Sequence, residues 1–219
     1  MQASPVRRST VVALGVLAVV LRVGSAGAAP PEPAFLMPVE YAFDSGCTGD
    51  VLVVGTVEAG TAMAGDEVEL VGMGEGKLKS TITGVEMFRK EGDVAGAGDG
   101  VGLLLRGIDK KDIRRGMVVA KPGTITPHTE FRAVLSAVAE EGGRHTPFHN
   151  GMTLQFGFRT TEVTGEIELP GGRGAIAPGS SGVATVRLIV PVAMDKGLGF
   201  TIREGGRTVG AGQVIEIIK

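Results

Sequence analysis

The stretch IREGGRTVGAG, residues 202–212, carries the strongest structural signal in the chain. Gly205-Gly206 supplies the backbone freedom of a tight primed turn, and the residues on either side suit a pleated strand. Gly210 and Gly212 alternate with small or apolar neighbours, as happens where a strand bends or another backbone passes close by. The stretch therefore predicts two β-strands joined by a two-residue turn.

The composition of the whole chain agrees with a β-protein. Its 219 residues include 36 glycines and no tryptophan, a mixture that favours short strands and many turns. The length suffices for one or two domains with a workable core. Cys47 is the only cysteine, so an internal disulfide and a multi-cysteine metal site are excluded, and we predict no metal site.

Charge is distributed unevenly along the chain. The formal net charge is −2, but residues 1–31 hold three arginines and no acidic residue. Beyond them the chain carries 19 basic and 24 acidic residues, a net charge of −5. An acidic body argues against broad, non-specific nucleic-acid binding and against DNA as a partner. Any RNA contact therefore requires a local basic patch.

Residues 1–32 are predicted to be a short hydrophobic leader. Arg7-Arg8 precedes the apolar run Val11–Leu21, and small residues at 25–29 follow, an order typical of a secretory signal peptide. The lack of acidic residues also fits an organelle transit peptide, and a third alternative is a mis-assigned start joined to a gene fragment. The apolar run is too short to predict a stable membrane span. Export and organelle import both stay open.

Residues 33–124 and 125–219 each contain a series of strand-like segments separated by turns. In the first part the clearest segments are VLVVGTVEAG (51–60), DEVELVG (66–72), KSTITGVEMF (79–88), VGLLLRG (101–107) and MVVAKPG (117–123). In the second part, TEFRAVL (129–135) and ATVRLIV (184–190) place apolar residues on one face. Residues 153–169 form either one long strand or a hairpin broken near Gly165. The sequence predicts an all-β protein with two tandem antiparallel β-barrels.

Several motifs follow one another along the body in a fixed order: FLMPVE (35–40), GVEMFRK (84–90), AKPGTITPHTEF (120–131), QFGFRTTEVTG (155–165) and the stretch 202–212. With them, residues 35–219 resemble the second and third domains of elongation factor Tu, the translational GTPase that brings aminoacyl-tRNA to the ribosome. The resemblance implies two β-barrels that bind aminoacyl-tRNA, in the cytoplasm or in an organelle. It also implies a second partner, the nucleotide-exchange factor Ts, which touches the second barrel.

Motifs of a nucleotide-binding domain are missing from this sequence. No G-x-x-x-x-G-K-[ST] loop occurs, and Asn150 is the only asparagine, so a guanine-reading Asn-Lys-x-Asp motif is excluded. We therefore predict that the chain is not an enzyme and takes no cofactor. GTP and Mg²⁺ are expected only for an intact family member, and a nucleotide-binding domain in trans is a further candidate partner.

For the first barrel, the resemblance implies a pocket for the aminoacylated 3′ end of tRNA. The matching residues are Glu40, Phe43, Glu86, Phe88 and Arg89. A carboxylate can hydrogen-bond ribose or base, and an arginine offers charge and a stacking face. The alternative is that the two phenylalanines are core residues and Glu86 is a solvated strand residue. Tyr41 stands where the family usually has an acidic residue.

For the second barrel, the resemblance implies a surface that grips the T-stem of tRNA. The matching positions are Gln155, Thr164 and Glu204, with Arg159, Arg203 and Arg207 nearby. Such side chains bind phosphate and ribose without reading base identity, which suits a factor that accepts many tRNAs. The alternative is that the arginines form ion pairs within the barrel or face a domain that this sequence lacks.

Two functions of other classes compete with that of a tRNA-binding translation-factor fragment. One is an exported or surface interaction protein built on the same barrels. The other is a truncated gene product with no independent role. Sequencing the mature N-terminus separates them, because cleavage near residues 26–29 indicates export or import.

Overall fold

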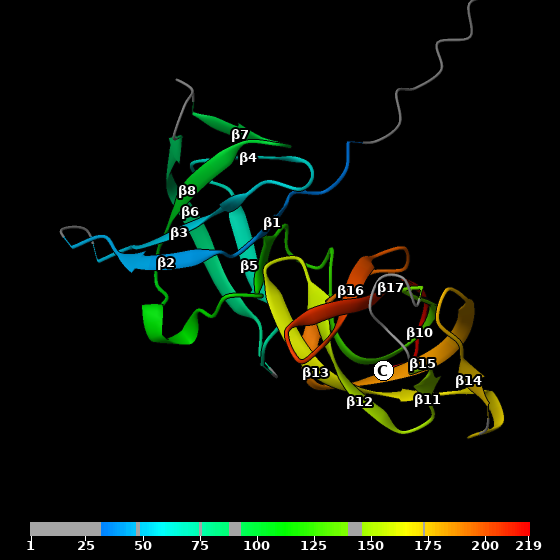
Figure 1. Cartoon of the computed structure of the whole chain (residues 1–219). Helices are drawn as coiled ribbons and strands as arrows, with labels where there is room; N and C mark the ends of the chain where they lie inside the picture. The colour runs from blue at the N-terminus through cyan, green and yellow to red at the C-terminus, as the bar shows by residue number, and fades with distance from the viewer. Residues whose placement is uncertain (1–31, 47–48, 75, 88–92, 140–145, 173) are drawn as a thin grey trace, which may run out of the picture. The chain divides into compact units, whose positions relative to one another are not determined.

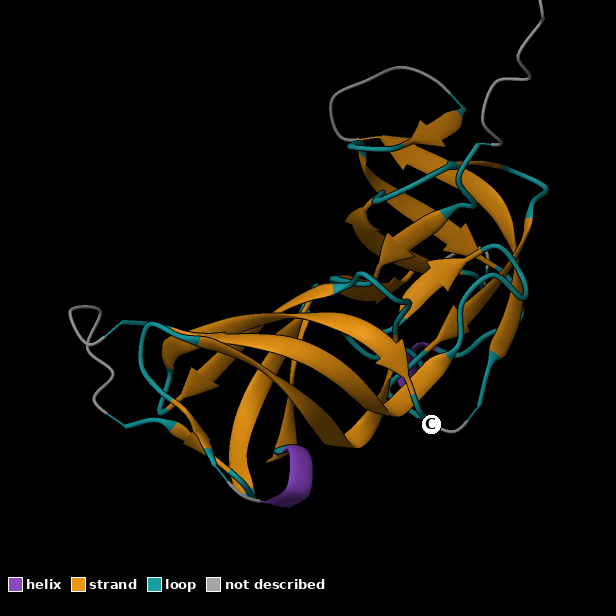
Figure 2. Ribbon diagram, turned by 90° about the vertical axis from the view of Figure 1, so that its right-hand side faces the viewer, coloured by secondary structure: helices purple, strands orange, loops and turns teal. Residues whose placement is uncertain are grey.

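The computed structural model describes residues 32–46, 49–74, 76–87, 93–139, 146–172 and 174–219 (Figure 1). Residues 32–219 make up one compact unit. Leader residues 1–31 lie outside the described part of the chain, as do Phe88 and Arg89. Within the described part, the helical segments are short 3-10 turns, and no helix is long and apolar enough to cross a membrane (Figure 2). The all-β prediction is confirmed.

Seven strands in the first half of the body form one antiparallel sheet in the order β1-β9-β5-β6-β8-β3-β2. Their bounds are β1 Leu36–Pro38, β2 Tyr41–Asp44, β3 Val51–Thr56, β5 Glu67–Val71, β6 Leu78–Met87, β8 Gly100–Leu105 and β9 Val118–Ala120. Strands β4 (Thr61–Met63) and β7 (Val94–Gly96) pair with each other, and the 3-10 turn η1 (Lys110–Asp112) precedes β9. Alternate residues such as Val53 and Leu103 are buried in a common core.

The two edge strands of this sheet are consecutive pieces of the chain. Strand β1 pairs with β9 and β2 pairs with β3, while the backbone N–H of Glu40 between them donates to the Val54 carbonyl at 2.9 Å. Gly55 permits this approach, because a Cβ there would lie 2.1 Å from the Pro38 carbonyl oxygen. One segment thus reaches both edges, and the sheet curls into a half-barrel, not a closed barrel.

Six strands in the second half close into an antiparallel barrel in the order β10-β15-β13-β12-β16-β17. Their bounds are β10 Pro127–Ala137, β12 Met152–Phe158, β13 Thr161–Glu168, β15 Ser181–Ala193, β16 Gly199–Glu204 and β17 Arg207–Ile217. Strands β11 (Phe148–His149) and β14 (Ala175–Ile176) form a separate ribbon, and η3 spans Pro170–Gly172. Phe131, Phe156, Phe158 and Phe200 pack inside the barrel, with ring centroids 5.2 to 6.0 Å apart.

Two hairpins of the closed barrel test the turn predictions. Gly205 and Gly206 have φ values of +54° and +79°, the left-handed values of the predicted primed turn between β16 and β17. Residues 153–169 do form a hairpin, but it turns at Arg159-Thr160, and the predicted break near Gly165 is wrong. Gly165 lies inside β13, where a Cβ would lie 2.9 Å from the Arg187 carbonyl oxygen. Close packing requires the glycine there.

A buried ion pair ties the first sheet to the connection that leads into the closed barrel. Glu69 of β5 is 3% exposed. Its Oε1 accepts from Lys77 Nζ and from the backbone N–H of Gly123, both at 3.0 Å. Lys77 also donates to the Ile125 carbonyl at 3.3 Å. We call Glu69, Lys77 and residues 123–125 the clasp, because together they hold the connection against β5.

Candidate nucleic-acid interface

The outer face of the closed barrel carries a row of polar side chains across four neighbouring strands. Thr164 of β13 lies opposite Gln155 of β12, Gln155 lies opposite Arg203 of β16, and Arg203 lies opposite Thr208 of β17. Directly opposite residues have Cβ atoms about 4.5–5.5 Å apart. Three predicted T-stem residues therefore lie side by side. We call Thr164, Gln155, Arg203 and Thr208 the polar row.

Arg203 is held in place by its neighbours on the barrel. One Nη donates to a carboxylate oxygen of Glu162, and the other donates to the Gly206 carbonyl at 2.7 Å. Its Nε is buried without a hydrogen-bond partner. The alternative of an ion pair within the barrel therefore holds for Arg203. The guanidinium is positioned rigidly, and Glu162 neutralises much of its charge.

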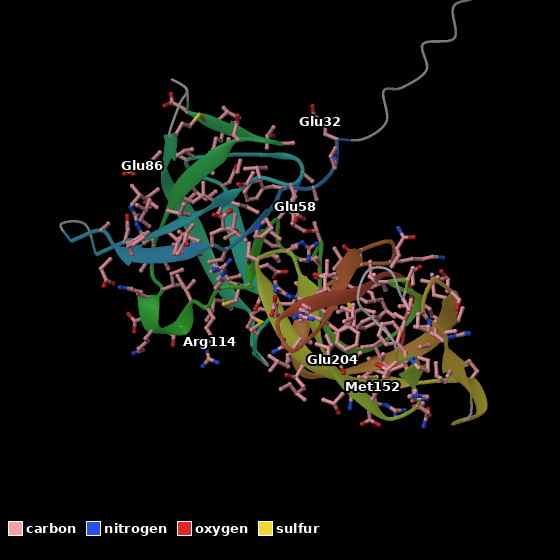
Figure 3. The ribbon with its side chains drawn as sticks, in the orientation of Figure 1. Glu32, Glu58, Glu86, Arg114, Met152 and Glu204 are labelled. Atoms are coloured by element: carbon pink, nitrogen blue, oxygen red, sulfur yellow. The ribbon has the colours of Figure 1, made fainter. Side chains whose placement is uncertain are left out.

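The tip of the β16–β17 hairpin presents two exposed charges beside the row. Glu204 and Arg207 flank the Gly205-Gly206 turn and face each other in the register (Figure 3 labels Glu204). The Arg207 side chain forms no ion pair or hydrogen bond with another residue in the described part of the chain. Arg207 is thus the cation of this surface with most freedom to meet an external anion.

Arg159 occupies a different position, at the contact between the two sheets. Its side chain is only 10% exposed, and its Nε donates to Glu58 Oε2 at 2.8 Å. One Nη donates to the Ala193 carbonyl at 2.7 Å, and the residue adopts a left-handed φ of +45°. The neighbouring Thr160 hydroxyl donates to the Val39 carbonyl at 2.8 Å. Arg159 therefore joins the sheets and stands outside the polar row.

A hollow of about 900 Å³ lies beside the row, and sequence reasoning missed it. Arginines and hydroxyl groups surround it, and small residues form part of its lining: Arg115, Arg159, Arg203, Thr160, Thr161, Thr201, Gly157, Gly199, Ala211 and Gly212. Arg115 comes from the segment between η1 and β9, and no local motif indicated that it reaches this hollow. The glycines at 157 and 199, both on strands, were the available signal, because each leaves a gap on a barrel face.

The outer face of the first sheet brings three predicted 3′-end residues together. Tyr41, Val54, Gly102 and Glu86 form one cross-strand row, and Phe43, Leu52, Leu104 and Gly84 form the next. Glu40 lies at the margin, where its Oε1 accepts from the Thr56 hydroxyl at 3.3 Å. Glu86 is exposed on β6 (Figure 3). We call Tyr41, Phe43, Leu52, Val54 and Leu104 the aromatic patch.

Both rings of the aromatic patch face solvent. Tyr41 is 56% exposed and Phe43 is 50% exposed, so the alternative that Phe43 belongs to the core is wrong. Their centroids are 6.3 Å apart with an interplanar angle of 29°. For Tyr41 the sequence signal was only that it stands where the family usually has an acidic residue.

Charged side chains of η1 lie near the end of β2. Lys110 pairs with Asp44 at 3.5 Å, and Lys111 pairs with Asp109 at 2.8 Å. The hydrogen bond from Lys111 to the Asp109 carboxylate raises the pKa of Lys111 above its ordinary value. Within the described residues, no group of three or more His, Cys, Asp or Glu side chains is placed to hold a metal ion.

Two family models match this chain, one over most of the first sheet and the other over the closed barrel. The model of elongation factor Tu domain 2 matches residues 50–120, from just before β3 to the end of β9. The model of the elongation factor Tu C-terminal domain matches residues 124–218, which include the whole closed barrel and the polar row. Neither matched model is a nucleotide-binding domain. Through these two domains in tandem, the chain belongs to the elongation factor Tu family.

Proposed function

We propose that this chain binds tRNA weakly through the polar row and Arg207, as an elongation factor Tu-like module that works without GTP. The observation that carries the proposal is the alignment of Thr164, Gln155 and Arg203 on three adjacent strands. Because a closed barrel has no free edge, the positions of these side chains are fixed relative to one another. Hydrogen-bond donors in a fixed row suit the phosphates and riboses of one RNA strand.

The chemistry of the row favours contact with the RNA backbone. A hydroxyl, an amide and a guanidinium all donate hydrogen bonds to phosphate or ribose oxygens, and none of these contacts depends on the base. Glu162 offsets part of the Arg203 charge, while Arg207 stays exposed. The attraction is therefore local, and the acidic remainder of the chain limits the affinity. Such binding falls steeply as salt rises.

The test measures binding of the full chain to unmodified, fluorescently labelled tRNA by anisotropy at about 50 and 200 mM salt. Arg207→Ala should weaken binding about tenfold, which corresponds to one charge-assisted contact of about 1.5 kcal/mol. It should also lower the slope of log affinity against log salt concentration by the amount expected for the loss of about one phosphate contact. Arg132→Ala is the matched control, because Arg132 lies on β10 of the same barrel and pairs with Glu216. No binding at low salt, or equal effects of both substitutions, would refute the proposal.

A second proposal concerns the hollow beside the polar row. Gly157 and Gly199 leave space there, and Arg115, Arg159 and Arg203 surround it. We propose that a nucleotide-binding domain supplied by another chain docks here. Gly199→Phe, which fills the space, should abolish co-elution with a separately produced domain of that kind. Co-elution that survives the substitution places the domain elsewhere.

A further inference from the structure

We propose that Met73 is a site of oxidation by hydroperoxides, and that its sulfoxide loosens the contact between the first sheet and the closed barrel. The inference does not depend on RNA binding. Met73 follows β5 closely in the chain, and its side chain packs against the cores of both sheets. Its backbone N–H also donates to the Pro191 carbonyl of β15 at 2.8 Å. One residue therefore joins the two sheets through its side chain and its backbone.

The backbone at Met73 is held in an unfavourable conformation. Its φ of +58° lies in the left-handed region, which side chains with a Cβ seldom adopt. Gly72 before it has a φ of +103°, and a Cβ there would lie 3.2 Å from the Ala193 nitrogen. Such a backbone persists only where surrounding contacts stabilise it. The position of Met73 therefore depends on its apolar contacts, and a change in the polarity of its side chain should release it.

An open hollow of about 280 Å³ gives a small oxidant access to Met73. Met73 is half-buried and lines this hollow together with Lys111, Arg114 and Met117. Met117 is only 5% exposed, and its sulfur already accepts from the backbone N–H of Arg114 at 3.3 Å. A peroxide must reach a lone pair of the sulfur to react with it. Met73 is therefore the reactive methionine of this hollow, and Met117 is an internal control.

The reaction transfers one oxygen atom from the peroxide to the Met73 sulfur. The sulfur attacks a peroxide oxygen, the O–O bond breaks, an S=O bond forms, and the peroxide leaves as water or an alcohol. The sulfur loses two electrons, which the peroxide gains. The product is polar, and its oxygen has no donor between two apolar cores. Arg114 (Figure 3) offers donors in the hollow, because its guanidinium forms no ion pair or hydrogen bond within the described residues. The oxidised side chain should therefore turn away from the closed barrel towards Arg114.

The test treats the full chain with dilute hydrogen peroxide and follows each methionine by mass spectrometry of its peptide. Met63, which is 47% exposed on β4, should oxidise readily, and Met73 should oxidise well before Met117. Hydrogen exchange is then measured on the same sample. The Met73 amide should exchange about five- to thirtyfold faster after oxidation, because its bond to the Pro191 carbonyl opens more often. Exchange at Phe156, inside the closed barrel, should stay unchanged.

Variants separate the effect of Met73 from that of the other methionines. Met73→Leu keeps the apolar bulk but has no sulfur, so peroxide should leave its exchange unchanged. Met63→Leu is the matched control: it removes the most exposed methionine of the described residues and should keep the full response. Met73→Gln carries a polar oxygen from the outset and should exchange fast without peroxide.

Circular dichroism checks that each variant folds, and if Met73→Leu does not, the wild-type chain before and after oxidation decides alone. The inference is overturned if Met117 oxidises as fast as Met73, if the oxidised wild-type chain exchanges as slowly as the reduced one, or if a folded Met73→Leu responds to peroxide like the wild type.

Discussion

Replacing Lys77 by methionine should destabilise the chain more than replacing its partner Glu69 by glutamine. In Lys77→Met the Glu69 carboxylate stays almost fully buried and keeps only the N–H of Gly123 as a donor. Removing one partner of a buried pair costs about 3–5 kcal/mol. The Lys77 side chain is 34% exposed, so water already screens part of the pair, and we expect the lower end, about 3 kcal/mol.

Glu69→Gln should cost only about 1 kcal/mol, because the amide oxygen still accepts from Gly123 and Lys77 can turn towards water. The double variant should be more stable than Lys77→Met alone, since it removes the buried charge together with its partner. Urea unfolding followed by circular dichroism measures these differences, and hydrogen exchange of the Gly123 amide reports on the clasp itself. Equal destabilisation by the two single substitutions, or strict additivity in the double variant, would falsify the electrostatic account of the clasp.

Three further predictions concern packing, the contact between the sheets, and nucleotides. Gly212→Ala should destabilise by about 1–3 kcal/mol in urea unfolding, because the new Cβ would lie 2.4 Å from Phe200 Cζ. Gly199→Ala is its neutral control, with no atom closer than 3.9 Å. Arg159→Gln removes the bond to Glu58 and should speed hydrogen exchange at the contact without unfolding either sheet, and unchanged exchange there would count against it. Calorimetry with GTP or GDP should give no heat, because the phosphate loop and guanine motif are missing, and micromolar binding would contradict this.

The sequence predicted the turns correctly where the residues of the turn themselves determine the backbone conformation. Gly205-Gly206 predicted its turn because only glycine adopts two consecutive left-handed conformations cheaply. The turn at Arg159-Thr160 has no such marker. Arg159 takes the left-handed φ that a two-residue hairpin turn needs at its first residue, and Glu58 and the Ala193 carbonyl, both distant in sequence, bind its guanidinium. Tertiary contacts of this kind leave no signal in the local sequence. The turn was therefore predicted near Gly165, because glycine is a common turn residue.

In the candidate surfaces, too, the sequence predicted the residue types but not the strand register that brings them together. Family motifs supplied Gln155 and Thr164, but only the pairing of β12 with β13 places them opposite each other. The exposure of Tyr41 depends on β2 lying at an edge of its sheet, with its outer face turned away from the core. Residue types were therefore predictable, whereas the side of the sheet on which they meet depended on strand pairing.

The clasp gives the two surfaces a reason to act together. Two weak sites on one compact unit bind a ligand that spans both more tightly than either alone, because the second contact forms at a high effective concentration. That gain depends on a fixed geometry, and Glu69 and Lys77 fix the connection between the sheets. Lys77→Met should therefore weaken binding of a tRNA with its single-stranded 3′ end more than binding of the same tRNA without that end, which would contact only the polar row. Equal effects of Lys77→Met on the two RNAs would mean that the two surfaces bind independently.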